Sequence, residues 1–451
     1  MSARGRGSLE AVVEFLARVS HRWVPDAFSI ALLLTLVTFV LGLLVGGATP
    51  SQCLAAWGGS LWTLLPFSMQ IALVIFLGYL LAVSPPMKRW LDQLAALPRT
   101  PRQAIAFTAF TSMVLCWLNW GVGLIASAVL VKSVGRRHPS ADYRLLVAAA
   151  YLGLGATWHG GPSGSVPLLL ATPGSFMVTD GLIAAPIPLA ETIFTLHNLV
   201  LMTGIALVLT LLVASLQPSA DRVVTADRHV LDALESFEPP ERPARPLPAE
   251  RLMHGRALSA GLGLLGAAYV AAEAAAGRFS LTLDSVNLVV LCLALLLHPS
   301  AASLGKAAEE AARPLHGVVL QFPLYAGIYG IIKETGLASA LARLFLEVAT
   351  PHTFPWIVFV YSAILNYLVP SGGAKWAMEA PYLLEASRGL GIPVTEVAMA
   401  YAYGDMSTNL IQPFWAIPLL GVARLEFRDI LGFEILMLAA YTILVTAALF
   451  L

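Results

Sequence analysis

Charged side chains are scarce in this sequence. Asp, Glu, Lys and Arg make up 12% of its 451 residues, whereas soluble proteins carry about 25% to cover their surface. Hydrophobic residues reach 58%, and the mean hydropathy is +0.77. These values exclude a water-soluble protein and indicate a chain whose solvent is the lipid bilayer.

An excess of either charge is also missing. Lys plus Arg and Asp plus Glu each number 27, so the balance predicts no nucleic-acid or polyanionic partner. Cysteine is rare: Cys53, Cys116 and Cys292 lie in separate apolar stretches, without the spacing of a disulfide framework or a zinc site. We therefore expect no structural metal and no cofactor.

Long hydrophobic runs are abundant. About 20 apolar residues suffice for a helix to cross the bilayer, and the pattern predicts nine crossings. They are residues 27–47, 61–83, 145–172, 191–216, 257–275, 284–298, 317–332, 394–423 and 430–451. Two further apolar segments, 104–134 and 354–388, are each broken in the middle by Asn, Gly, Pro or Ser residues.

Basic residues set the predicted orientation, because cytoplasmic loops are enriched in Lys and Arg. Four arginines precede the first crossing and place the N-terminus in the cytoplasm. Segment 104–134 has basic residues on both flanks, so we expect a re-entrant hairpin that turns near Asn119. Segment 354–388 is predicted to form a second hairpin on the external side.

The two halves of the sequence resemble each other. A shift of 251 positions aligns Thr157 with Thr408 and Pro162 with Pro413, and the order helix, helix, hairpin, broken helix, helix recurs. An odd number of crossings separates the halves, so the second copy would be inverted. The predicted fold class is an all-α polytopic membrane protein with two inverted-topology repeats, each with a re-entrant hairpin and a broken transmembrane helix.

The same pattern predicts the organisation of the chain. The N-terminal repeat covers 1–216, with its hairpin at 104–134 and its broken helix at 145–172. A Pro-rich, charged cytoplasmic linker follows at 217–256. Residues 257–451 hold an extra helix and the inverted C-terminal repeat, with its hairpin at 354–388 and its broken helix at 394–423.

Four polar breaks interrupt these apolar segments, at residues 119–123, 157–165, 366–373 and 405–413. A helix that starts at such a break directs unpaired N–H groups and a positive dipole end inward, which suits a carboxylate. Side-chain oxygens and free carbonyls at the breaks suit Na⁺. Ordinary kinks would explain one break, but repeat-related positions favour a transport site. The predicted Na⁺ candidates are Asn119, Asn366, Ser407 and Thr408.

Titratable residues at membrane depth are functional candidates. Asp405 could relay a proton at its broken helix. Lys375 and Glu379 lie four residues apart and could act in coupling or simply pair with each other. His159 could take part in coupling or be a core histidine that donates to a carbonyl.

A second class of function has to be weighed. Gly161-Pro162-Ser163-Gly164 matches the GxSG motif of intramembrane serine proteases. That chemistry needs a membrane-embedded histidine beside the serine, and His197 would be the one to supply it. The proline inside the motif and the repeat symmetry argue against a protease, and inverted repeats favour alternating access over a channel.

Several motifs together resemble the bacterial short-chain fatty acid transporter family, within the wider ion transporter superfamily. The resemblance covers nearly the whole chain. The matching motifs are at residues 21–26, 119–121, 163–165, 171–174, 369–373 and 412–416. Three positions depart from the family pattern, which has glycine at His159, histidine near Lys375 and glutamate at Asp405.

The resemblance implies uptake of short-chain monocarboxylates such as butyrate or acetoacetate, driven by H⁺ or Na⁺. It also implies an elevator-type carrier in the bacterial inner membrane, and analogy with elevator-type relatives implies a homodimer. Another small organic anion is the alternative substrate. The expected substrate-binding residues are Asn119, Gly121, Ser163, Ser165, Ser371, Gly372 and Asn409. The expected apolar neighbours of the substrate are Trp158 and Trp415.

Overall fold

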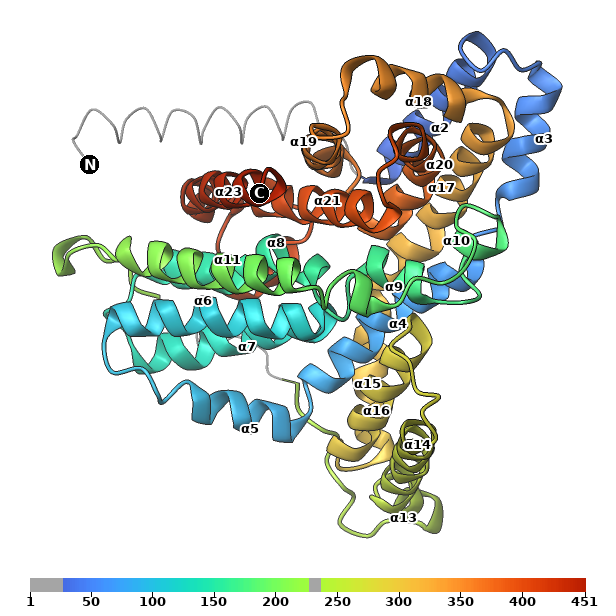
Figure 1. Ribbon diagram of the computed structural model, residues 1–451. Coiled ribbons are helices and arrows are strands. Elements are labelled where there is room, and N and C mark those ends of the chain that lie inside the picture. Colours follow the sequence, from blue (N-terminus) through green and yellow to red (C-terminus); the bar gives the residue numbers. More distant parts are fainter. Residues whose placement is uncertain (1–26, 227–236) are drawn as a thin grey trace.

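The computed structural model describes residues 27–226 and 237–451 (Figure 1). The N-terminal arginines, the motif at residues 21–26 and part of the predicted linker lie outside the described residues. Within the described residues all regular secondary structure is helical, and no strand occurs. The prediction of an all-α protein is confirmed.

Ten α-helices build the first half of the described chain. The helices of the first half are α2 (Ala27–Leu44), α3 (Pro50–Ser60), α4 (Leu65–Ala82), α5 (Pro85–Leu94), α6 (Pro101–Leu118), α7 (Trp120–Arg137), α8 (Tyr143–Ala156), α9 (Ser165–Ala171), α10 (Phe176–Thr179) and α11 (Leu196–Ser215). The sequence patterns gave no expectation for α3 and α5, which are short helices between the longer ones.

The second half begins after the linker. Its helices are α13 (Pro248–Met253), α14 (Ala257–Ala275), α15 (Leu283–Leu297), α16 (Ala301–Ala312), α17 (His316–Glu334), α18 (Leu337–Val348), α19 (Phe354–Leu368), α20 (Gly372–Leu390), α21 (Val394–Ser407), α22 (Ile417–Ala423) and α23 (Phe427–Leu449). In this half α13, which lies within the predicted linker, α16 and α18 are the helices that hydropathy alone did not predict.

Local capping explains where many of these helices begin. The side chains of Thr100, Asp142 and Thr195 each accept a hydrogen bond from a first-turn N–H group of α6, α8 and α11. Proline occupies the first turn of α3, α4, α5, α6 and α19, where its missing N–H group is not needed. The helix starts are therefore encoded close to where they occur.

The spacing of the elements agrees with the 251-residue offset. Adding 251 to the bounds of α8 gives 394–407, the bounds of α21, and the same shift brings α4 to within one residue of α17. A similar contact also recurs. Ser112 Oγ of α6 donates to the Ala150 carbonyl, and Ser362 Oγ of α19, one residue before the position that the offset gives, donates to the Tyr401 carbonyl. The inverted orientation of the two halves stays a prediction.

The two predicted hairpins differ in their packing. α6 and α7 meet at Asn119 and pack along each other, whereas α19 and α20 meet at residues 369–371 with little mutual contact. Instead α19 packs on α21, and α20 packs on α17 and α18. Entry and exit of each hairpin on the same side of a membrane stays a prediction.

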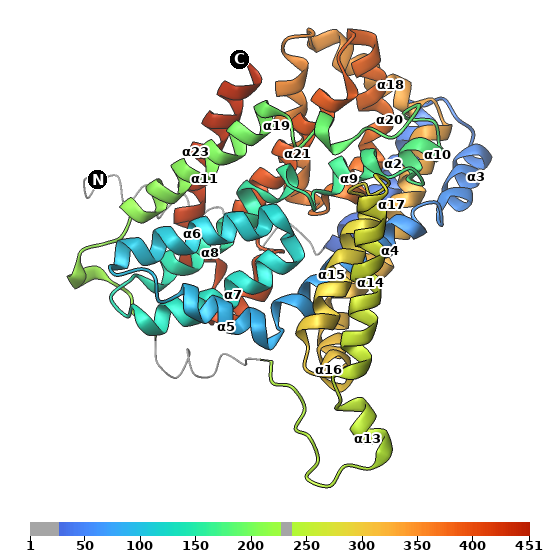
Figure 2. The same cartoon turned by 60° about the horizontal axis from the view of Figure 1, so that its bottom comes forward.

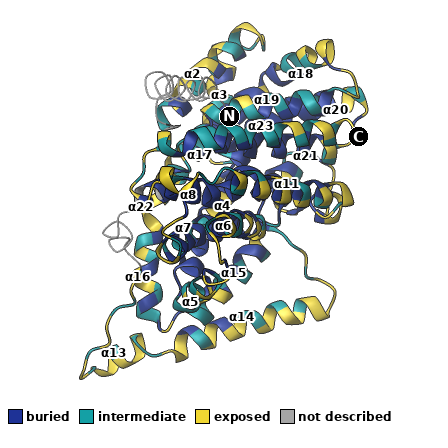
Figure 3. Ribbon diagram, turned by 90° about the vertical axis from the view of Figure 1, so that its left-hand side faces the viewer, coloured by how far each residue is buried: buried dark blue, intermediate teal, exposed yellow. Residues whose placement is uncertain are grey.

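Apolar helices form the outside of the molecule. Among the described residues, five helical segments are long and apolar enough to cross a membrane: 65–82, 196–215, 248–275, 301–334 and 427–449. α14 extends along α15 (Figure 2) and is coloured largely as exposed (Figure 3). Exposed leucines on such a helix suit contact with the hydrocarbon core of the bilayer.

Candidate functional site

Two interrupted helices bring polar backbone into the protein interior. After α8 the chain makes a single 3-10 turn, Trp158–Gly160, before α9, and after α21 it makes the turn Thr408–Ile411 before α22. Side chains tie the two breaks together. Asn409 Nδ2 donates to the Leu154 carbonyl at 3.0 Å, and the Tyr151 hydroxyl donates to the Asn409 carbonyl at 2.9 Å.

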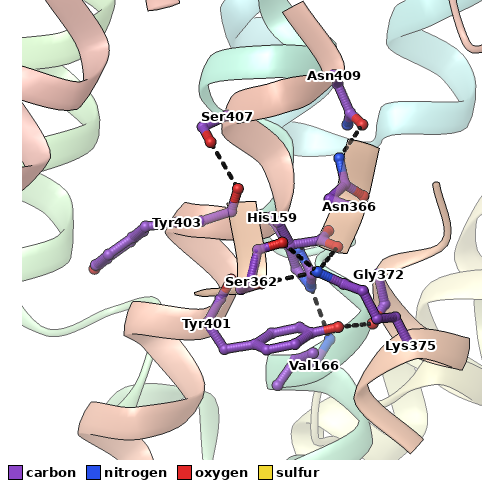
Figure 4. A network of polar contacts seen from close by, with 12 residues as sticks. His159, Val166, Ser362, Asn366, Gly372, Lys375, Tyr401, Tyr403, Ser407 and Asn409 are labelled. Atoms are coloured by element: carbon purple, nitrogen blue, oxygen red, sulfur yellow. Dashed lines mark hydrogen bonds and ion pairs between the residues drawn. The ribbon is translucent and has the colours of Figure 1, made fainter. Parts of the chain in front are cut away.

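Asp405, in the last turn of α21, is fully buried and shared between two partners. Its Oδ1 lies 3.1 Å from Lys375 Nζ of α20, and its Oδ2 lies 2.9 Å from His159 Nδ1 of the first break. Lys375 Nζ also donates to the Ser362 carbonyl at 2.7 Å and to the Ser362 hydroxyl at 2.9 Å (Figure 4). We call His159, Ser362, Lys375 and Asp405 the central cluster.

The hydrogen bonds of His159 fix its protonation state. Its Nε2 accepts from the Val166 N–H group at 3.1 Å, so the proton of a neutral ring must lie on Nδ1 and point to Asp405. The histidine is therefore neutral in this arrangement. With one lysine and one aspartate, the central cluster carries no net charge.

Lys375 is engaged within the protein. Its ammonium group donates twice to Ser362, and it forms an ion pair with Asp405 Oδ1 at 3.1 Å that lacks hydrogen-bond geometry. The same group lies 4.6 Å from the centre of the Tyr401 ring. The helical spacing of four residues also allowed a pair between Lys375 and Glu379. That pair is not formed, because Asp405 is the partner of Lys375.

Glycine lets the start of α20 approach the central cluster closely. A Cβ atom at Gly372 would collide with the Asp405 carboxylate and lie 2.7 Å from His159 Cε1. One at Gly373 would press on the Phe67 ring and lie 3.1 Å from Ser165 Cβ. These two positions therefore require glycine.

The two hairpin tips differ in their hydrogen bonding. At the start of α7, Asn119 Oδ1 accepts from the Val122 N–H group at 3.0 Å, and Ser163 Oγ accepts from the Trp120 N–H group at 2.9 Å. At the start of α20, Ser371 provides no such cap. The first tip is thus closed by its own side chains, whereas the second is open.

Hydroxyl groups border this open tip. Ser371 is half-buried and Ser165 is 4% exposed. Neither hydroxyl makes a hydrogen bond within the described residues, and the first-turn N–H groups of Gly372 and Gly373 likewise lack an acceptor there. We call Ser165, Ser371, Gly372 and Gly373 the α20 start. Its donors and positive dipole end suit a carboxylate.

Three tryptophans line the neighbouring surface. The ring of Trp120 lies edge-on to Trp158 at 5.8 Å and to Trp415 at 5.5 Å. Trp158 stacks on His159 at 4.2 Å, and Trp415 Nε1 donates to the Pro370 carbonyl at 3.1 Å. An apolar wall therefore stands beside the donors of the α20 start.

Comparison with known proteins identifies the family. Residues 8–451 match the model of a family described as short chain fatty acid transporter. The chain belongs to the short-chain fatty acid transporter family. It is 39% identical to a candidate short-chain fatty acid transporter of Escherichia coli K12 over 94% of this chain and 95% of that protein.

Other relatives agree with this assignment. A candidate short-chain fatty acid transporter of Haemophilus influenzae is 34% identical over 94% of this chain and 96% of its own length. Among solved structures, the YdaH transporter of Alcanivorax borkumensis superposes with a TM-score of 0.61 and 16% identity, over 94% of this chain and 97% of that one. The fold is therefore that of a multi-pass membrane transporter.

Family membership excludes the protease alternative. The chain is a transporter-family protein and not an enzyme. The site agrees: Ser163 Oγ accepts from a backbone N–H group, and His197 lies exposed on α11. No histidine is a hydrogen-bond partner of Ser163 among the described residues.

Several predicted ligands of the transporter have structural partners. Asn366 Nδ2 donates to Asn409 Oδ1 at 2.9 Å and to Thr408 Oγ1 at 3.1 Å. Ser407 Oγ donates to the Gly404 carbonyl at 2.7 Å. A side chain at Gly121 would collide with the Val74 carbonyl. These side chains already have partners within the protein, and Gly121 serves close helix packing, so they differ from the unpaired hydroxyls of the α20 start.

Glu379 lies near the central cluster without a complete set of partners. Its side chain is 2% exposed, and its Oε2 has no hydrogen-bond partner among the described residues. Lys375 and Asp405 lie within electrostatic range of it. Its place beside the cluster keeps it a candidate for coupling.

The sequence pattern did not predict two important residues. Ser362 gave no signal because a single serine in an apolar helix is common, yet its carbonyl and hydroxyl both accept hydrogen bonds from Lys375. Glu434 was overlooked although it is a lone carboxylate inside the predicted crossing 430–451. The rule that ionisable residues at membrane depth are functional candidates would have found Glu434.

Proposed function

We propose that this protein takes up short-chain monocarboxylates, such as butyrate or acetoacetate, by cation-coupled alternating access of the elevator type. The observation that carries the proposal is the α20 start, an uncapped helix start with two unpaired hydroxyls, buried between two broken helices. The known family supports a carboxylate substrate and a bilayer environment.

In this proposal the substrate carboxylate binds at the α20 start. Ser165, Ser371 and Gly372 are its nearest donors. Asn119, Ser163 and Asn409 shape the opposite side through their own hydrogen bonds, and Gly121 does so by allowing close packing against Val74. The short alkyl tail rests against the tryptophan wall, where its burial is favoured by roughly 0.8 kcal/mol per CH₂ group.

The central cluster explains why a cation should accompany the anion. Asp405 already neutralises Lys375, so the site offers N–H and O–H dipoles and not an unpaired cation. A carboxylate that enters such a site is compensated most simply by a cation that travels with it. We assign the coupling machinery to Asp405, Lys375, His159 and Glu379, with H⁺ or Na⁺ as the coupling ion.

Location and assembly follow the same proposal. We place the protein in the bacterial inner membrane with its N-terminus in the cytoplasm, because basic residues gather on the predicted cytoplasmic loops. A homodimer is the expected assembly, by analogy with elevator-type carriers.

Uptake of labelled butyrate into proteoliposomes tests the function directly. Na⁺ and pH gradients are imposed separately, and protein-free liposomes measure the butyric acid that crosses the bilayer unaided. Protein-dependent accumulation with either gradient is expected. If neither gradient drives butyrate uptake, competition among small organic anions in binding assays would show which other anion replaces it.

Ser371→Ala tests the binding site. Loss of one hydrogen bond to a charged ligand costs about 1.5–3 kcal/mol, so we expect the KM for butyrate to rise about 10- to 100-fold in initial-rate measurements. Folding should be unaffected, because the hydroxyl has no partner in the protein. Ser339→Ala on α18, another half-buried serine, is the matched control. An unchanged KM in Ser371→Ala would remove this residue from the site.

A further inference from the structure

Glu434 is a carboxylate without a partner in the protein interior. It lies about a third of the way along α23, which is long and apolar enough to cross a membrane. Its side chain is 0% exposed. Neither of its carboxylate oxygens has a hydrogen-bond partner among the described residues. The mechanism proposed above does not use this group.

Its own helix offers no compensation. On a helix the neighbours three and four residues away share one face. Around Glu434 these neighbours are Ile430, Leu431, Met437 and Leu438. Three of them are buried and all four are apolar, so no intrahelical ion pair or hydrogen bond stabilises a charge here.

The elements packed against α23 do not supply a cation either. They are α8, α11, α19, α21 and the turn Thr408–Ile411, and none of them contains lysine. The arginine of α8, Arg144, is paired with Asp142 at 3.2 Å. Tyr151 of α8 lies within electrostatic range of Glu434. The other titratable side chains of these elements are Tyr143, His197, Tyr361, Tyr367, Glu396, Tyr401, Tyr403 and Asp405.

An isolated carboxylate cannot persist in such surroundings. Burial of an unpaired charge is so costly that the group takes up a proton instead. Protonation removes the charge, so the only polar cost left is one O–H donor without an acceptor among the described residues. In the conformation described here Glu434 therefore holds a proton, and it can release that proton only in a conformation that admits water.

We propose that Glu434 is the site at which the coupling proton binds during transport. The proposal rests on the proposed function and deepens it by selecting H⁺ as the coupling ion. Asp405 is a poorer proton site in this conformation, because the cation of Lys375 lies 3.1 Å from one of its oxygens and His159 Nδ1 lies 2.9 Å from the other. The central cluster then keeps the substrate site neutral, while Glu434 carries the proton.

Helix packing and hydrogen bonds connect α23 to the substrate site. α23 packs on α8, and Tyr151 of α8 donates its hydroxyl proton to the carbonyl of Asn409 at 2.9 Å and of Gln412 at 3.4 Å. Asn409 in turn holds Leu154 of the first broken helix. A charge that appears at Glu434 would act on the junction that ties the two breaks, which gives proton release a route to the conformational change.

The experiment compares wild type, Glu434→Gln and the control Glu396→Gln, which changes an exposed carboxylate, in proteoliposomes. Glutamine imitates the protonated acid. Glu434→Gln is expected to exchange labelled for unlabelled butyrate at close to the wild-type rate, while accumulation driven by an inside-alkaline pH gradient falls to the protein-free level. Glu396→Gln should match wild type in both assays. Gradient-driven accumulation by Glu434→Gln at the wild-type level would overturn the proposal.

A second measurement needs no substrate. The infrared carbonyl band of protonated carboxylic acids should contain a component in purified wild type that is missing in Glu434→Gln. If the glutamine variant does not fold, Glu434→Asp, which keeps a titratable group, should shift both this band and the pH dependence of uptake.

These readouts separate the two proposals. A Glu434 acid band in wild-type protein that shows no butyrate uptake would contradict the proposed substrate and retain the proton site. Accumulation driven by Na⁺ alone, without any effect of a pH gradient, would retain the function and contradict the proton site. Absence of the acid band in folded wild type would also overturn the role of Glu434.

Discussion

Asp405→Asn is expected to lower the free energy of unfolding by about 3–5 kcal/mol, because it leaves the buried ammonium of Lys375 without its counter-charge. Lys375 is fully buried, and its ion pair with Asp405 spans α20 and α21. The asparagine oxygen can still accept from His159 Nδ1, so the loss comes from the lysine. Thermal unfolding of the purified protein in detergent measures the effect.

A compensating change distinguishes this charge effect from a general disturbance of packing. The double variant Asp405→Asn with Lys375→Met removes both charges, and replacement of a buried ion pair by apolar groups is often neutral or stabilising. We expect it to recover most of the lost stability. Asp221→Asn, whose exposed carboxylate pairs with Arg222, is the matched control and should change little. A double variant as unstable as the single one would contradict this account.

Gly404→Ala is expected to destabilise the protein by about 3 kcal/mol or more, at the upper end of overpacking effects. An added Cβ would collide with the Phe359 carbonyl of α19, and its nearest side-chain neighbour is Ser362 Cβ at 3.0 Å. Backbone cannot move aside as a flexible side chain can, so α19 and α21 must separate. Because Ser362 holds Lys375, uptake should fall together with thermal stability.

The control for this variant is Gly261→Ala on α14. No atom lies within 4 Å of a Cβ at Gly261, and alanine favours a helix over glycine by roughly 0.5–1 kcal/mol. Stability should be unchanged or slightly higher. Equal thermal unfolding of Gly404→Ala and Gly261→Ala would show that the close approach of α19 and α21 does not matter.

Hydropathy and break residues predicted much of the architecture. The extra helix predicted at 257–275 has the bounds Ala257–Ala275, because its apolar run has clear polar flanks. The interruptions predicted near residues 157–165 and 405–413 occur where α8 and α21 end, since Gly disfavours a helix through its conformational freedom and Pro lacks the N–H group that a helix needs. Short helices such as α5 and α18 were not predicted, because their amphipathic pattern lacks the length of a crossing.

The candidate site was only partly predictable. Asp405, Lys375 and His159 were singled out because charge at membrane depth is rare. Their mutual contacts were not foreseen, because they come from three elements, and Lys375 with Glu379 looked like the natural pair at helical spacing. The difference between the capped α7 start and the open α20 start also depends on Ser163, a residue 43 positions from its partner Trp120.

The sequence by itself determined the solvent of this protein, its helical class and the positions of its breaks, because composition and local backbone preference act over short distances. The family also follows from the sequence alone. Only the tertiary structure decided which charges neutralise each other, which helix start remains open and which carboxylate is left alone at Glu434. Those properties depend on the distances between side chains of different helices, and burial turns such distances into large electrostatic differences.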